Sequence, residues 1–462
     1  MKKLIVYLIL AVILIVGLNL RRFSYAEVPL PGETADEYSF GWLGISLIKD
    51  RYPVAWSGIS GYRNHDYQKI NVDRLYDIDP NRPPFSIDKP WFDHPPLFGL
   101  VTGGFAYLSG VRNFADASVL ILRRPMVIIG FINIFLIFVL ANMLYKEKIA
   151  LLSAAIYSFS PLIVISSRLA LAENGYVPIF LLSLIFTLTY LKKKNIKYWY
   201  VACILAGTSI LFKLSAIAIP ITLATYLILL KKKINLKLLT PLLACTIAAL
   251  LAFVIYGAIF DLGIFWDVIK ANSGRVFGAG AEIFYQAVSQ SKITTERTFS
   301  DGWILLGWIS FFALVYKGWR KNSADTLIAI TVFCILFVFL IFGSEPYGWY
   351  RFPIYPFLAI SAAKIISNLY RSKHILLTYF LLLIPFGTTM HRLYGFDGFS
   401  QFVPLFRLST FFVFCVFILN LISKDKVKFL FKVIITIIIL LVFYLSIREV
   451  YFFNVDRWYF ST

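Results

Sequence analysis

The chain has 462 residues, of which 59% are hydrophobic, and its mean hydropathy is +0.75. This composition excludes an ordinary soluble domain, which is nearer half apolar. The formal net charge is +20, but Lys and Arg gather in short loops between apolar runs, a membrane-protein pattern and not a nucleic-acid-binding one. The cysteines all lie inside apolar runs, which favours core positions over disulfides or metal ligands: Cys203, Cys245, Cys334 and Cys415.

The first apolar run, Leu4–Leu20, follows Met1-Lys2-Lys3. One interpretation is a cleaved signal peptide with Ser24-Tyr25-Ala26 as a small-residue cleavage site. The run is longer than a usual signal core, and Arg21-Arg22 follow it at once. We therefore expect a retained helix. Its flanking arginines orient the chain only weakly.

Six basic clusters in later loops indicate the topology, because such loops are normally cytoplasmic: Lys146/Lys148, Lys192–Lys194, Lys231–Lys233, Lys317/Arg320/Lys321, Arg371/Lys373 and Lys424/Lys426/Lys428. Apolar runs of about 17–25 residues suit helices that cross a bilayer. About thirteen spans agree with the clusters: 4–20, 119–145, 149–166, 174–191, 198–212, 214–230, 238–258, 302–316, 325–343, 351–370, 374–390, 403–422 and 429–447. This topology predicts a multi-pass plasma-membrane protein with a cytoplasmic N-terminus and an external C-terminal tail.

The longest polar stretch, Asp36–Leu97, then forms an external loop. Pro95–Gly110 is apolar enough for a span, but counting it would place Lys146 and Lys148 outside, so we expect a helix lying at the membrane surface. Asp36–Ile48 has helical spacing of apolar residues and predicts a second interfacial helix, capped by Thr34 or Asp36. Residues 64–91 are rich in Asp, Asn and Pro and predict a loop.

A second external segment, Phe260–Ser300, contains a glycine-rich patch at Gly274–Gly280. The patch lacks the Lys-Ser/Thr ending of a phosphate-binding loop, so we expect a mobile loop over a site. The chain divides into a transmembrane module at 1–258 that includes the external loop 21–118, this loop at 259–301, and C-terminal transmembrane helices at 302–462.

Several charged residues fall at the external ends of spans: Arg168, Glu173, Lys213 and Arg351. Charges at membrane depth are costly and mark a function or a pair. In the purely structural interpretation, Arg168 pairs with Glu173, Arg351 pairs with Glu345, and Lys213 snorkels to the surface. The functional interpretation is that all converge with the first-loop residues Asp36, Asp93 and His94.

Such a set suits a lipid-linked phosphate donor. A carboxylate can take a proton from an acceptor hydroxyl, and cations can stabilise a departing phosphate. Glu37 is adjacent to Asp36 and can raise its proton affinity, although Asp-Glu is also an ordinary helix-start pattern. We predict no cofactor and no metal. A site built from Asp93 and His94 is the alternative.

The ordered elements resemble a known family. These are Asp36-Glu37, then Asp93-His94-Pro95-Pro96-Leu97, then Arg168–Glu173, and finally Tyr350–Leu358. The order is similar to that of GT-C glycosyltransferases, in the group of protein O-mannosyltransferases and aminoarabinose lipid A transferases. The resemblance covers roughly residues 1–230 and the late motif.

The resemblance implies an all-α polytopic GT-C fold, Asp36 as general base, and a polyprenyl-phosphate sugar donor. Glu173 stands where the family usually has Asp. We expect neither the soluble C-terminal domain of aminoarabinose transferases nor the insert of eukaryotic mannosyltransferases, which leaves the acceptor open.

The resulting hypothesis is an inverting membrane glycosyltransferase that moves a hexosyl or pentosyl group to a hydroxyl acceptor on the external face. The acceptor is a protein, lipid or glycan of the cell envelope. Asp36 and Glu37 are the catalytic candidates. Lys213, Arg351 and Arg168 are the phosphate-binding candidates, and Asp93, His94 and Glu173 line the pocket. The alternatives are a transporter or flippase of lipid-linked sugars and a non-catalytic subunit of envelope polysaccharide assembly.

Overall fold

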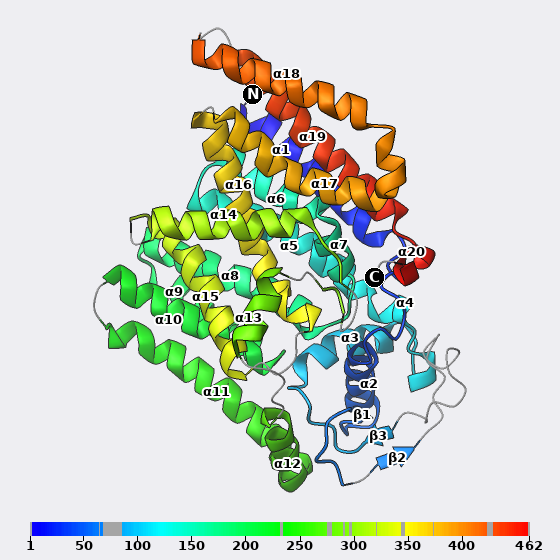
Figure 1. Ribbon diagram of the computed structural model, residues 1–462. Helices are drawn as coiled ribbons and strands as arrows, with labels where there is room; N and C mark the ends of the chain where they lie inside the picture. Colours follow the sequence, from blue (N-terminus) through cyan, green and yellow to red (C-terminus); the bar gives the residue numbers. More distant parts are fainter. Residues whose placement is uncertain are drawn as a thin grey trace.

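The computed structural model describes most of the chain. The described residues are 2–63, 65–67, 86–231, 234–274, 280–289, 292–294, 298–319, 321–342, 347–372, 374–422 and 428–460. Within these residues the protein is almost entirely helical, with one small sheet. Figure 1 shows a helical bundle with a compact group of shorter elements at one end.

The bundle is formed by long helices and the short helical segments that interrupt them. They are α1 (Lys2–Arg22), α4 (Val119–Leu122), α5 (Arg124–Leu144), α6 (Glu147–Phe159), α7 (Pro161–Ser166), α8 (Ala172–Lys193), α9 (Ile196–Ile210), η2 (Leu214–Ile217), α10 (Ala218–Lys231), α11 (Leu236–Phe260), α14 (Gly302–Gly318), α15 (Ser323–Phe342), η3 (Gly348–Ile354), α16 (Tyr355–Ser372), α17 (Ile375–Ser400), α18 (Val403–Ile422) and α19 (Lys428–Phe452).

Elements outside the bundle come from the two predicted external loops and the C-terminal end. They are α2 (Asp36–Lys49), β1 (Ala55–Trp56), β2 (His65–Tyr67), β3 (Ser86–Asp88), α3 (Leu97–Leu108), η1 (Phe114–Asp116), α12 (Leu262–Ser273), α13 (Gly280–Ser289) and α20 (Val455–Phe460).

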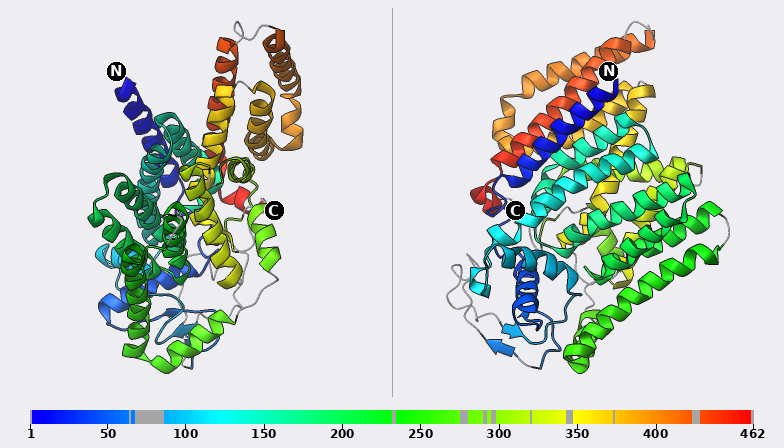
Figure 2. Two further views of the ribbon diagram at one scale, coloured as in Figure 1. Left: turned by 90° about the vertical axis from the view of Figure 1, so that its left-hand side faces the viewer. Right: turned by 180° about the vertical axis from the view of Figure 1, so that it is seen from behind.

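The protein is an integral, multi-pass membrane protein. Among the described residues, eight helical segments are long and apolar enough to cross a bilayer, and five further apolar helices are shorter. Each of the thirteen predicted spans falls on a helical segment, but the number that cross the bilayer stays a prediction. Figure 2 shows α18 on the outside of the group that it forms with α17 and α19.

The predicted span 149–166 is broken between α6 and α7. Proline has no N–H to donate and is favoured in the first turn of a helix, so the chain turns at Ser160 and α7 begins at Pro161. The Asp301 carboxylate accepts hydrogen bonds from Ser160 Oγ at 2.7 Å and from Leu162 N at 3.0 Å. It also accepts one from Trp303 N at 2.8 Å. A single buried carboxylate therefore caps the starts of both α7 and α14.

Both predicted interfacial helices are present, and they cross at very short range. Their contact is built on glycines: a Cβ on Gly44 of α2 would lie 2.0 Å from the carbonyl oxygen of Gly99 in α3. A Cβ on Gly103 would lie 2.4 Å from the carbonyl oxygen of Gly41. The start of α2 agrees with the prediction, and Thr34 Oγ1 accepts a hydrogen bond from the Asp36 N–H at 3.3 Å.

The two segments predicted as external loops contain more helices and strands than their composition indicated. Residues 64–91 include β2 and β3. Strand β3 pairs with β1 on one side and with β2 on the other, in an antiparallel sheet of order β1-β3-β2. Residues 68–85 lie outside the described residues. The segment 260–300 includes α12 and α13, while most of its glycine-rich patch lies outside the described residues. Two and three residues per strand were too few for an alternating pattern to show in the sequence.

Two helix ends that carry basic clusters, those of α5 and α14, lie close together. Tyr145, next to Lys146, donates a hydrogen bond to Asp325 at 2.5 Å, and Asp325 lies against Gly318, next to Lys317. The two terminal spans meet at one end, where the rings of Phe23 and Tyr451 lie 4.8 Å apart.

The α2–α3 crossing predicts a strong steric effect of Gly44→Ala. The added methyl group would overlap the backbone of α3, which cannot move aside as a flexible side chain can. Overpacking of this kind costs roughly 1–3 kcal/mol, so thermal unfolding in detergent should shift to lower temperature. Gly104→Ala is the matched control, because its nearest neighbour would be Ile48 Cδ1 at 3.6 Å, ordinary van der Waals contact. Equal unfolding temperatures for both variants would contradict the close crossing.

Candidate active site

Glu37 is buried and anchors the head of α2. Its carboxylate accepts from Arg123 Nε at 2.8 Å and from Arg123 Nη2 at 2.6 Å, a bidentate ion pair in which both side chains are fully buried. Its Oε1 also accepts the N–H of Ala170 at 2.7 Å. This geometry ties α2 to the start of α5 and to the segment after α7. The Glu37 carboxylate therefore holds the head of α2 in place. The sequence analysis had predicted a direct role for it beside Asp36.

Arg123 was missed in the sequence analysis. Its Nη1 donates to the carbonyls of Tyr25 at 2.9 Å and Pro29 at 2.6 Å, so the same guanidinium also holds the segment before α2. The available signal was Arg123-Arg124 at the external end of a predicted span, where the positive-inside rule does not expect a basic pair.

Asp36 is half-buried and lies at the first position of α2. Successive residues of an α-helix point about 100° apart, so Asp36 faces a different direction from Glu37. Its charge acts on the buried carboxyl of Asp93. The structure therefore brings these two first-loop carboxyls into one neighbourhood, although they come from opposite ends of the loop.

Asp93 is buried in a network of hydroxyl groups. Ser57 Oγ donates to it at 2.5 Å, and the Tyr62 hydroxyl donates to its other oxygen. Burial, with smaller contributions from the charges of Asp36 and Asp88, outweighs these two hydrogen bonds and raises the pKa of the Asp93 carboxyl to about 7. Asp93 can therefore hold a proton near neutral pH.

His94 belongs to an aromatic cluster. Its ring stacks on Phe40 with centroids 5.4 Å apart and meets the edge of Trp91 at 6.0 Å. Among the residues that the structure describes, no group of three His, Cys, Asp or Glu side chains is placed to hold a metal ion.

Lys213 and Glu173 form a second buried ion pair. Lys213 Nζ lies 2.6 Å from Glu173 Oε1, and it also lies 5.1 Å from the centre of the Tyr350 ring. Lys213 occupies the turn between α9 and η2, at the junction of the predicted spans 198–212 and 214–230. Glu173 is in the first turn of α8. The structural interpretation, in which Glu173 pairs with Arg168, is therefore wrong.

Arg168 contacts the backbone. Its Nη1 donates to the carbonyl of Val28 at 2.9 Å and its Nη2 to the carbonyl of Leu20 at 2.8 Å, and the side chain is fully buried. These contacts hold the end of α1 against the segment after α7. These contacts use two of the five N–H donors of the guanidinium, and its buried Nε makes no hydrogen bond within the described residues, so the phosphate-binding role of Arg168 stays a prediction.

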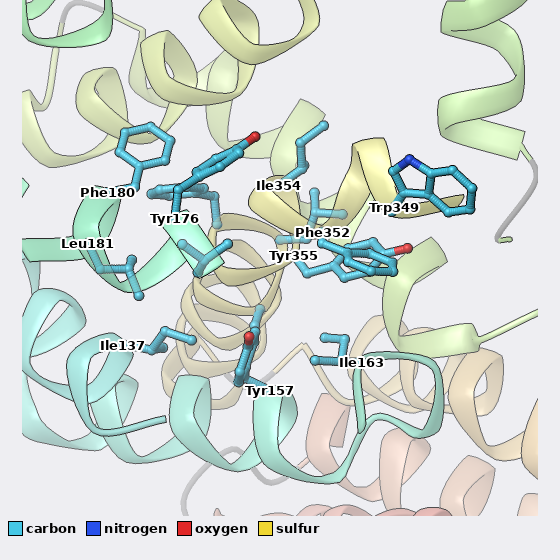
Figure 3. Packing of buried hydrophobic residues seen from close by; sticks show 14 of the residues in the cluster. Ile137, Tyr157, Ile163, Tyr176, Phe180, Leu181, Trp349, Phe352, Ile354 and Tyr355 are labelled. Carbon is cyan, nitrogen blue, oxygen red and sulfur yellow. The ribbon is translucent and has the colours of Figure 1, made fainter. Parts of the chain in front are cut away.

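Arg351 lies in η3, a tight helical segment packed against α8. Figure 3 shows Trp349, Phe352, Ile354 and Tyr355 facing Tyr176 and Phe180 of α8. Arg351 itself is buried. Its predicted alternative partner, Glu345, lies outside the described residues.

The first loop docks directly on the Lys213 region. The N–H of Leu97, at the start of α3, donates to the carbonyl of Leu211 at 3.1 Å. Phe98 contacts Phe212 with ring centroids 6.1 Å apart. Gly175 leaves room for Phe98, whose ring atoms would lie 2.4 Å from a Cβ at that position. The start of α3 thus packs beside the residues that flank Lys213 and Glu173, while convergence of the charged side chains themselves stays a prediction.

Comparison with known proteins agrees with this architecture. Residues 93–259 match the family model described as dolichyl-phosphate-mannose-protein mannosyltransferase. A search of curated proteins found no match to the sequence.

Solved structures with a similar fold include the ArnT protein of Cupriavidus metallidurans bound to undecaprenyl phosphate, with a TM-score of 0.55 at 16% identity over 96% of this chain and 77% of that one. An oligosaccharyltransferase of Archaeoglobus fulgidus tethered to an acceptor peptide has a TM-score of 0.53 at 11% identity, over 97% of this chain and 55% of that one.

The chain therefore has the GT-C fold of membrane glycosyltransferases. It resembles the mannosyltransferases and aminoarabinose transferases of that superfamily. The family model covers the stretch from Asp93 to the end of α11, which includes the docking interface of the first loop.

The raised pKa of Asp93 predicts a specific dependence of stability on pH. The folded chain keeps this proton up to about pH 7, whereas the unfolded chain releases it near pH 4. The folded state then binds more protons between these values, so its stability falls as pH rises through that window, by at most about 4 kcal/mol.

Asp93→Asn carries no titrating group but can still accept from Tyr62. The parent's unfolding temperature minus that of Asp93→Asn should therefore decrease between about pH 4 and pH 8. A difference that stays constant over this range would show that Asp93 is ionised throughout.

Proposed function

We propose that this protein transfers a sugar from a polyprenyl-phosphate donor to a hydroxyl acceptor, with Asp36 as the general base. One observation supports the proposal: the α2–α3 unit, with half-buried Asp36 at the head of α2, docks beside Lys213 through the Leu97 N–H and the Leu211 carbonyl at 3.1 Å. Glu37 holds α2 there through Arg123 at 2.6 Å. Lys213 occupies the other side of this interface at the end of α9.

The donor class follows from the kind of charge that the site offers. The ArnT structure with this fold contains undecaprenyl phosphate, and a lipid phosphate needs cations at the membrane surface. Lys213 and Arg351 meet that need in this chain. An ammonium has three N–H donors, of which one reaches Glu173 at 2.6 Å, so Lys213 Nζ can also contact a phosphate oxygen.

The reaction is a single displacement. Asp36 takes the proton of the acceptor hydroxyl as its oxygen forms a bond to the anomeric carbon. The bond from that carbon to the phosphate oxygen breaks, both electrons leave with the phosphate, and the carbon is inverted. Lys213 and Arg351 stabilise the negative charge on the leaving group, which is worth most where water is excluded.

The other residues act around this step. Asp93 and His94 line the first-loop side of the pocket, and Glu173 orients Lys213. Arg168 and Glu37 hold α1 and α2 in place. The basic ends of α5 and α14 meet at the end of the bundle opposite Asp36, which supports an external active site under the positive-inside rule. Sugar and acceptor remain unspecified by these contacts.

Asp36→Asn tests the base. The amide retains the shape and an acceptor oxygen but cannot take a proton, so the chemical step should slow by roughly 10²–10⁴-fold. Donor affinity should change little, since the cations lie on other segments. Transfer of labelled sugar from polyprenyl-phosphate sugars to an extract of the host's envelope would be measured beside donor binding.

A transporter or flippase would bind or move the donor and never yield labelled acceptor, so the parent protein alone separates that alternative. Parent-rate transfer by Asp36→Asn would instead eliminate Asp36 as the base and leave Asp93 or Glu173 as the candidate.

The phosphate contacts predict a loss of donor affinity when the cations are removed. Lys213→Met is combined with Glu173→Gln, so that no buried carboxylate is left without its cation, and Arg351→Ala is made separately. Each lost charged contact should cost about 1.5–3 kcal/mol, tenfold or more in donor affinity. Lys193→Ala is the control, because Lys193 is exposed and its Nζ donates to the Tyr198 hydroxyl at 3.2 Å, away from the site. Equal donor affinity in all variants would make both cations structural.

A further inference from the structure

Glu33 lies three residues before Asp36, in the segment that leads into α2, and it is bound from two distant parts of the chain. Its Oε1 accepts a hydrogen bond from Trp458 Nε1 at 2.6 Å. Its Oε2 accepts one from Thr294 Oγ1 at 3.3 Å. Hydrogen bonds to an ionised acceptor are roughly twice as strong as neutral ones, so this carboxylate fixes the segment firmly.

Trp458 reaches Glu33 from α20, beyond the last long helix. Its side chain is 1% exposed. The ring meets the edge of Phe453 at 6.0 Å, and Phe453 in turn meets the edge of Phe299 at 5.2 Å. A buried indole N–H normally finds a hydrogen-bond partner, and here that partner is the segment that carries the base.

Thr294 joins the same segment to η3. Its hydroxyl donates to Glu33, and its carbonyl oxygen accepts the N–H of Gly348 at 3.1 Å. The approach of the two backbones is close, because a Cβ on Gly348 would lie 2.5 Å from the carbonyl oxygen of Lys292. Arg351 follows Gly348 by three residues within η3. Thr294 is fully buried and thus contacts both the segment before the base and the segment with the phosphate cation.

We propose that Glu33, Thr294 and Trp458 are positioning residues that set the distance between the Asp36 carboxylate and the Arg351 guanidinium. The inference rests on the proposed transfer reaction. A displacement needs the attacking oxygen, the anomeric carbon and the phosphate in line, and a misplacement of about 1 Å can cost 10²-fold in rate. Asp36 and Arg351 come from opposite parts of the chain. Thr294 provides a path of two hydrogen bonds between their segments.

Two variants each remove one donor to Glu33: Thr294→Val, which keeps nearly the same volume, and Trp458→Phe, which keeps an aromatic ring of smaller size. Each should lower the maximal transfer rate by roughly 10–100-fold and change the donor KM little, because the cations themselves remain. Thr294→Ser retains the hydroxyl and should restore the parent rate. Thr240→Val is the control, because the exposed Thr240 hydroxyl donates to the carbonyl of Leu236 within its own helix.

A double variant tests whether the Trp458 contact acts through Glu33. Residues that act through one group give non-additive effects, so Glu33→Gln combined with Trp458→Phe should be little slower than the slower single variant. Fully additive losses would overturn the inference.

Three further results are informative. Parent-rate transfer by Thr294→Val and Trp458→Phe, with Asp36→Asn slowed, would overturn the positioning role and leave the proposed function standing. Equal losses in rate, donor affinity and unfolding temperature, without rescue by Thr294→Ser, would reduce these contacts to scaffold and also overturn it. If the parent transfers no sugar from any polyprenyl-phosphate hexose or pentose, the proposed function itself fails.

Discussion

The buried ion pair between Glu37 and Arg123 is the interaction on which the candidate site depends. Both partners are fully desolvated, and such a pair is stable only when its remaining donors and acceptors are also satisfied. Glu37 receives the Ala170 N–H, and Arg123 reaches two carbonyls before α2. Removing either partner would leave a charge in the protein interior, which costs far more than the net contribution of the intact pair. The pair therefore specifies where the head of α2 sits.

Buried charge is used twice more, with different consequences. Arg168 satisfies the carbonyl of Leu20 in the last turn of α1. Lys213 is paired with Glu173, so each buried charge is offset by the other. In the proposed reaction, an entering phosphate meets a cation already desolvated and oriented, and most of the reorganisation has occurred during folding.

The sequence predicted the architecture well because its signals are strong there. Long apolar runs and basic loops define the helices, and polar residues between them define the loop that bears Asp36 and Asp93. The partners of the buried charged side chains were harder to predict. The sequence alone allows Glu173 to pair with Arg168 or with Lys213, and in the structure backbone carbonyls take up Arg168 and leave Glu173 to Lys213. Glu37 and Arg123 are distant in sequence, and nothing local in either segment predicts their contact. The short strands and α12 were missed because composition alone described their segments as loops.

At the glycine crossing, the backbones of α2 and α3 touch with almost no side chains between them. The two helices must therefore move as one rigid unit. Leu108, at the end of α3, is 87% exposed, and Leu100 is 38% exposed. These side chains fit the acyl boundary of a bilayer, where an interfacial helix settles at a depth set by its apolar face. On the predicted interfacial placement of these helices, the bilayer itself sets the height of Asp36 above the hydrocarbon core. Lipid thickness and headgroup packing then become part of the geometry in which, in the proposed reaction, the carboxylate meets a membrane-anchored phosphate.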